Sequence, residues 1–107
     1  MAASIEPVIQ AFLEGKKKTI SNTSTDGESL YLFGNRIAWI DRERDVLTVT
    51  NANWRSKTTK DRINMLPNVW VRQHRREWYI RIGNHYKDIN DGWKIWDGKP
   101  IEIDLRD

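Results

Sequence analysis

Residues 51–67, which read NANWRSKTTKDRINMLP, group side chains that could hold an anionic ligand. Trp54 offers an aromatic face, and the cations that follow it are Arg55, Lys57, Lys60 and Arg62. They lie just before and within a predicted short helix, whose first backbone N–H groups attract anions. The segment therefore favours contact with phosphate groups or with an acidic protein surface. A charged face that meets only solvent is the alternative.

A second group lies in the hairpin that residues 69–82 predict, with its turn at Arg75-Arg76. Side chains alternate along each strand, so one face is apolar and the other collects aromatic and guanidinium groups. The residues of this second face and of the turn are Trp70, Arg72, Arg75, Arg76, Tyr79 and Arg81. Aromatic platforms flanked by arginine suit unpaired bases, and the same residue types are enriched at protein interfaces. Stacking of arginine on tryptophan within the sheet would explain the pattern without a ligand.

The basic character is confined to the middle of the chain. Residues 54–81 carry eight Lys/Arg and two Asp/Glu, a net charge of +6, against −1 for residues 1–53 and −2 for residues 82–107. A local positive stripe is typical of surfaces that bind phosphate or an acidic protein. The same charge argues against an inhibitor that mimics DNA, because such a protein needs a strongly acidic surface.

Patterns typical of catalysis are not found in the sequence. His74 and His85 lie eleven positions apart, in neither metal-ligand nor triad spacing, and there is no cysteine. Asp88 and Asp91 could bind a cation near His85, but a DINDG segment is more typical of a turn. We therefore expect no catalytic residue, no metal ligand and no cofactor. An enzyme with an unrecognised site in the SNTSTDG loop is the remaining alternative.

The elements that must position these residues can be predicted from periodicity. Residues 4–14 predict an amphipathic helix, with Ser4 as its N-cap and Gly15 after its last turn. Residues 21–29, SNTSTDGES, are all turn-forming and predict an exposed loop outside the core. Thr58 or Thr59 predicts the N-cap of a short helix that ends before Pro67.

Strands account for the rest of the chain. Residues 30–33, 37–41 and 46–51 alternate in the strand manner and predict a meander whose first turn is Gly34-Asn35. The hairpin of residues 69–82 follows, and the alternating isoleucines and leucine of residues 101–105 predict a C-terminal strand. We expect one α+β domain over residues 1–107, with the meander, hairpin and last strand in one mostly antiparallel sheet.

Several quoted segments carry a resemblance that extends over nearly the whole chain. FLEGKKK, NTSTDG, LYLFGNRIAW, NANWRSKTTKDRINMLPNV, EWYI and WDGK occur in this order between Phe12 and Lys99. In this pattern the chain resembles short proteins of bacteriophage and other mobile-element genomes, a group with no assigned activity. The resemblance implies a small accessory protein made inside a bacterial host, and it carries over no functional residue.

We expect a binding protein rather than an enzyme, with nucleic acid as its partner through the basic and aromatic residues named above. The alternative is an inhibitor or adaptor that binds a host or anti-phage defence protein through the same residues. No apolar run is long enough to span a bilayer, the first residues lack the order of a secretory signal, and cysteine is absent. These features predict a cytoplasmic protein without a membrane partner.

Overall fold

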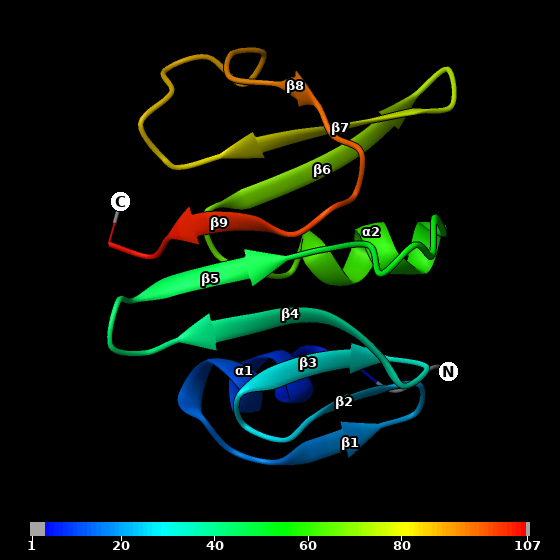
Figure 1. Cartoon of the computed structure of the whole chain (residues 1–107), viewed down its shortest axis with the longest axis vertical. Helices are drawn as coiled ribbons and strands as arrows, with labels where there is room; N and C mark the ends of the chain where they lie inside the picture. Colours follow the sequence, from blue (N-terminus) through cyan, green and yellow to red (C-terminus); the bar gives the residue numbers. More distant parts are fainter. Residues whose placement is uncertain (1–3, 107) are drawn as a thin grey trace.

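The computed structural model describes residues 4–106, which form two helices and nine strands (Figure 1). A six-stranded antiparallel sheet has the order β1-β2-β3-β4-β5-β9. Its strands are β1 Lys18–Ile20, β2 Thr23–Thr25, β3 Ser29–Leu32, β4 Asn35–Asp41, β5 Val46–Val49 and β9 Ile101–Asp104. A three-stranded sheet has the order β6-β7-β8, with β6 Val69–His74, β7 Glu77–Ile82 and β8 Lys94–Ile95. The helices are α1 Glu6–Glu14 and α2 Lys57–Ile63.

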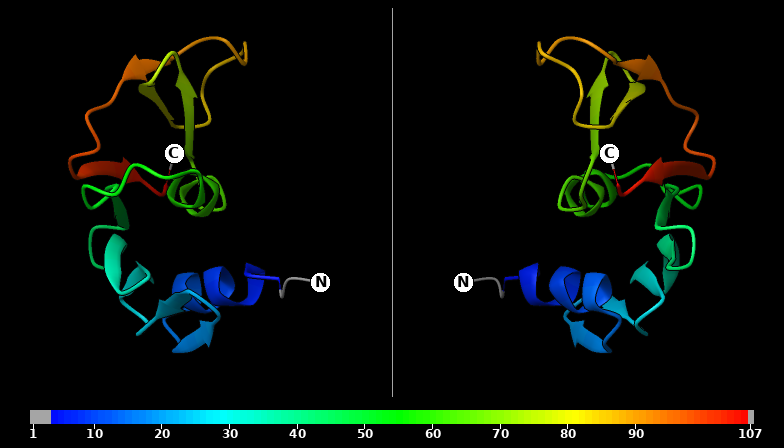
Figure 2. Two further views of the ribbon diagram at one scale, coloured as in Figure 1. Left: turned by 90° about the vertical axis from the view of Figure 1, so that its right-hand side faces the viewer. Right: turned by 90° about the vertical axis from the view of Figure 1, so that its left-hand side faces the viewer.

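The predicted α+β class with antiparallel strands is confirmed, but the expectation of a single sheet is wrong. The β6–β7 hairpin pairs with β8, which follows it along the chain, whereas β9 returns to the edge of β5. Both helices lie on one side of the six-stranded sheet (Figure 2). One buried cluster joins all the layers, and it includes Phe12 of α1, Ile63 of α2, Leu30 and Leu47 of the larger sheet, and Trp78 of the smaller one.

Helix α1 follows the predicted pattern with a small shift at its start. It begins at Glu6 rather than next to Ser4, although the Ser4 hydroxyl still accepts a hydrogen bond from the Glu6 N–H. Gly15 adopts φ +78°, the left-handed conformation in which glycine avoids a side-chain clash, and its N–H caps the carbonyls of the last turn. The Arg42 guanidinium also donates to the carbonyl oxygen of Phe12, at 2.9 Å.

The prediction that residues 21–29 form an exposed loop is wrong. Three of them form β2 between β1 and β3, where Thr23 and Thr25 are buried. Threonine is β-branched and suits a strand, and its hydroxyl can be buried when it is hydrogen-bonded. The Thr25 hydroxyl accepts from the Gly27 N–H at 3.0 Å. Turn-forming composition was therefore a poor guide in this segment.

The meander is confirmed, but its first turn lies one residue earlier than predicted. Leu32 pairs with Asn35, so the two turn residues are Phe33 and Gly34, both with positive φ. A bulge follows, because the register shifts between Leu30 and Tyr31. Trp39 is only half-buried and lies beneath the Arg36 guanidinium, 3.9 Å from the ring centroid.

Helix α2 starts earlier than the threonine pair predicts. Its N-cap is Ser56, whose hydroxyl accepts from the Thr59 N–H at 3.1 Å. The Thr59 hydroxyl instead donates to the Trp54 carbonyl, and Asp61 pairs with Lys57 rather than closing a capping box. These contacts fix the loop that precedes α2.

The C-terminal half behaves largely as predicted. The Arg75-Arg76 turn joins β6 to β7 in full register, from Val69 opposite Ile82 to His74 opposite Glu77. The predicted C-terminal strand is β9. Within residues 4–106, neither helix is long and apolar enough to cross a membrane.

Candidate binding surfaces

The tip of the β6–β7 hairpin presents two arginines to solvent. Arg75 and Arg76 are the two turn residues, with φ +50° and +71°. Positive φ at both positions defines a turn whose twist matches the flanking strands, and asparagine and glycine are its usual residues. With arginine at both positions, the backbone of the turn is therefore strained. Both side chains are exposed.

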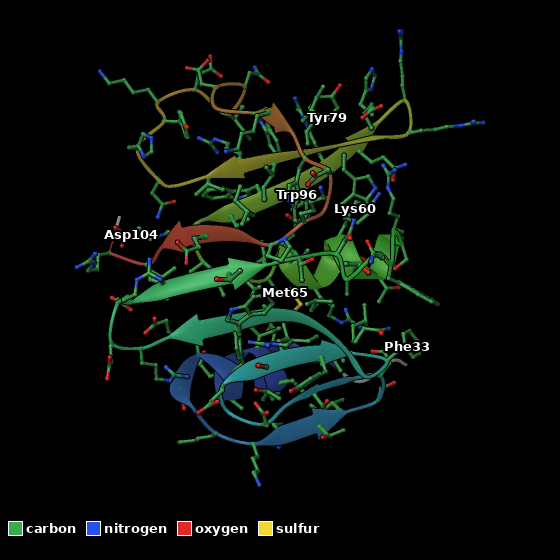
Figure 3. All side chains as sticks on the ribbon, viewed as in Figure 1. Phe33, Lys60, Met65, Tyr79, Trp96 and Asp104 are labelled. Atoms are coloured by element: carbon green, nitrogen blue, oxygen red, sulfur yellow. The ribbon has the colours of Figure 1, made fainter. Side chains whose placement is uncertain are left out.

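Cations from the α2 region approach the same tip. The Arg55 guanidinium donates to the Arg76 carbonyl oxygen at 2.8 Å, and the Lys60 ammonium donates to the Gln73 side chain at 2.6 Å. Both cations lie over the buried Trp78 ring, at 5.7 and 5.6 Å from its centroid. Figure 3 shows Lys60 between α2 and the hairpin. We call Arg55, Lys60, Arg75 and Arg76 the tip cluster.

Trp54 directly precedes the tip cluster in sequence and points outward. Its side chain is 50% exposed. The Trp54 N–H donates to the Asn51 carbonyl at 2.7 Å across Ala52 and Asn53, which both have positive φ. An exposed tryptophan ring of this kind offers a large apolar face for contact.

The predicted aromatic and arginine face of the hairpin is present. Trp70 pairs with Arg81 and Arg72 pairs with Tyr79, while the neighbouring apolar side chains turn into the core. We call Trp70, Arg72, Tyr79 and Arg81 the outer face. An open depression of about 480 Å³ at its tip end is lined by Arg72, Gln73, His74 and Tyr79. Tyr79 is labelled in Figure 3.

Two residues that the sequence did not single out complete the outer face. Tyr86 and Trp93 come from the segment between β7 and β8. Arg81 lies between two rings, 4.9 Å from the Trp70 centroid and 5.1 Å from the Tyr86 centroid. The Arg72 guanidinium lies 4.3 Å from the Trp93 centroid. The sequence left open that arginine stacks on tryptophan within the sheet, without any ligand. Trp70 and Arg81 do stack in this way.

Two of the predicted contact residues, Arg62 and Lys57, bond to other side chains. The Arg62 guanidinium donates to the Thr23 hydroxyl at 2.8 Å and to the Asn22 side chain at 3.3 Å, and so fastens α2 to the β1–β2 turn. Lys57 is exposed and forms an ion pair with Asp61 at 3.4 Å. Arg62 is thus committed to a structural role.

Carboxylate partners are distributed unevenly among the cations. Of the eight Lys/Arg in residues 54–81, only Lys57 has a carboxylate within 4.0 Å among the described residues. Outside this segment Arg44 meets Glu102 at 3.0 Å, and this hydrogen bond and charge hold the pKa of Glu102 below its usual value. The tip cluster and the outer face therefore carry positive charge that forms no ion pair with a carboxylate of residues 4–106.

Among the described residues, no group of side chains has the arrangement of an acid–base or metal site. Asp88 accepts the Asn90 N–H at 2.9 Å and so forms the turn predicted for the DINDG segment. Within residues 4–106, no three His, Asp or Glu side chains lie close enough to hold a metal ion.

Comparison with known proteins gives one match. A family model described as Kyanoviridae Gp96 protein matches residues 2–98, which is most of the chain. No curated protein and no solved structure matches the sequence.

Proposed function

The chain belongs to the Kyanoviridae Gp96 family and is therefore a phage protein, and from this premise we propose that it binds nucleic acid through the tip cluster, Trp54 and the outer face. The proposed role is that of a small accessory binding protein rather than an enzyme. Its place of action is the cytoplasm of the bacterial host.

The observation that carries the proposal is the set of cations without carboxylate partners around the hairpin tip. Arg75 and Arg76 extend into solvent, and Arg55 and Lys60 approach the same tip from α2. Phosphate groups would supply the negative charge that the described chain does not provide there. Contacts to the phosphate backbone are the same whatever the base sequence, so the tip cluster predicts binding to nucleic acid without strong sequence preference.

Aromatic groups next to the cations favour a single strand over a duplex. The Trp54 ring is half exposed, and the face of an unpaired base could stack on it. In a duplex the bases already stack on one another and offer no free face. We therefore propose single-stranded nucleic acid as the preferred ligand.

One observation supports a different partner. Ile89 and Ile95, near the outer face, are 75% and 67% exposed. Exposed apolar side chains beside tryptophan and arginine are typical of protein interfaces. An adaptor or inhibitor that binds a host or defence protein is therefore the second candidate, and its binding would persist at moderate salt.

The test is a titration of fluorescently labelled single-stranded and duplex oligonucleotides, followed by anisotropy at low and moderate salt. We expect saturable binding that weakens steeply with salt and is tighter for the single strand. Trp54→Ala should weaken single-strand binding by about 1–3 kcal/mol, the usual contribution of one stacked base. Trp39→Ala is the control, since Trp39 is a partly exposed tryptophan that lies on the six-stranded sheet, next to Arg36. Absence of saturable binding at low salt would overturn the proposal.

A further inference from the structure

Both guanidinium groups of the outer face are stacked against aromatic rings from one loop, although Arg81 is nearly buried and Arg72 remains exposed. We call residues 85–93 the cover loop; it lies between β7 and β8. Its Tyr86 ring lies against Arg81, and its Trp93 ring lies against Arg72. The two strands of the hairpin thus each contribute an arginine whose flat face is occupied by the protein's own side chain.

Apart from these two contacts between rings and guanidinium groups, few interactions attach the cover loop to the rest of the described chain. Its hydrogen bonds join loop residues to one another: the Trp93 indole donates to the Ile89 carbonyl, and the Asn90 and Asp91 N–H groups donate to Asp88. None of its side chains belongs to the buried apolar cluster of the described chain or packs against that cluster. Segments with few apolar contacts and exposed backbone open at low free-energy cost.

Arg81 is nearly buried, and part of its guanidinium group is unpaired. The residue is only 8% exposed, and its Nε–H has no hydrogen-bond partner. No carboxylate of residues 4–106 forms an ion pair with it. Buried charges are normally paired, because desolvation of the charged group is costly. Tyr86 and Trp70 provide ring faces to this guanidinium but no negative charge.

We propose that Arg72 and Arg81 form a nucleotide-binding site that is reached when the cover loop moves away, with bases of a single strand replacing Tyr86 and Trp93. This inference rests on the proposed function and deepens it: Arg75, Arg76 and Trp54 are already exposed, whereas the stacked faces of Arg72 and Arg81 become available only when the loop moves. A nucleotide offers both a flat ring and a phosphate, so it supplies the stacking that the loop provides and the charge that the loop lacks. The cover loop therefore competes with the ligand.

The test removes the competing rings. We expect Tyr86→Ala/Trp93→Ala to bind a short labelled polythymidine strand about tenfold more tightly than wild type, because two ring–guanidinium contacts no longer oppose the ligand. Duplex binding should stay unchanged. Adding Arg72→Ala to this double variant should abolish the gain. Thermal unfolding of each variant checks that the fold is kept.

A second variant displaces the loop without removing an aromatic ring. Gly92 has φ +83°, and a Cβ at this position would clash with the Tyr86 ring. Gly92→Ala should therefore push Tyr86 away from Arg81 and also tighten binding to the single strand. Agreement between the two variants would show that the position of the ring, and not merely its removal, controls access.

The outcomes separate the inference from the proposed function. If wild type binds the single strand but neither variant binds it more tightly, the covered site is refuted and the tip cluster stands. Weaker binding by the double variant would also refute it, because Tyr86 and Trp93 would then be contacts rather than competitors. If no form of the protein binds any strand, the proposed function fails and the inference fails with it.

Discussion

Replacing Arg75-Arg76 by Asn-Gly separates binding from folding more sharply than any other change in this chain. The two arginines occupy a two-residue turn at φ +50° and +71°, and Asn-Gly is the sequence that such a turn prefers. The substitution removes two positive charges from the tip cluster while it relieves backbone strain. Binding and stability should therefore change in opposite directions.

The magnitudes follow from the geometry. A non-glycine residue in the left-handed conformation costs about 1 kcal/mol, and glycine gives back part of this through its greater freedom in the unfolded chain. We expect a net gain of about 1 kcal/mol in the free energy of unfolding, or about 4–8 °C in Tm. Loss of two phosphate contacts on a single strand should flatten the plot of log affinity against log salt by about 1.4.

The assay combines thermal unfolding with anisotropy titrations at several salt concentrations. The control is Lys17→Gln/Lys18→Gln, which lowers the net charge equally at a site remote from the tip in sequence. Its salt slope should match that of wild type, because distant exposed charges are screened. An unchanged affinity and slope in the Asn-Gly variant would refute the role of the tip cluster, and a lower Tm would refute the argument about strain.

Two further predictions concern stability. Arg62→Ala should lower the free energy of unfolding by about 1–3 kcal/mol, because it leaves the buried Thr23 hydroxyl without its donor. Its affinity for single-stranded oligonucleotides should stay unchanged. Denaturant unfolding and the anisotropy titration check these outcomes, and a loss of affinity in a folded variant would contradict the structural role. For Asp26, hydrogen bonds from the backbone N–H groups of Ser29 and Glu28 lower the pKa of the carboxyl group. Its stabilising effect is therefore present above the unfolded-state pKa of about 3.9 and lost as the pH falls through the lower folded-state pKa, so the Tm difference between wild type and Asp26→Asn should shrink on acidification; a difference that is independent of pH would contradict this.

Sequence periodicity predicts the hairpin well because both of its strands have one apolar and one polar side. The alternation of Val69 and Val71 with Trp70 and Arg72 leaves only one register in which the apolar side is buried. Periodicity fails in the segment before it, where Thr23 and Thr25 are buried although their neighbours are polar. There the contacts of the folded state, rather than local composition, determine which side chains are buried.

Strand periodicity also predicts which of the candidate residues lie together, but only within the hairpin. The predicted outer-face residues do share a face, because strand geometry places alternate residues together. The positions of Tyr86 and Trp93 depend on the path of an irregular loop, which has no periodicity to indicate them. Arg62 was grouped with its neighbours in sequence, but the rotation of α2 directs it toward the β1–β2 turn.

The tryptophans of this protein occupy environments that differ enough to give it two separate optical signals. Trp78 is almost fully buried, 5.9 Å from the Trp96 ring and close to two cations, so its emission should be blue-shifted and should change when the core opens. Trp54 faces solvent and should emit at longer wavelength. Selective excitation at the red edge would therefore follow events at the surface, while the short-wavelength emission follows the integrity of the core in the same cuvette.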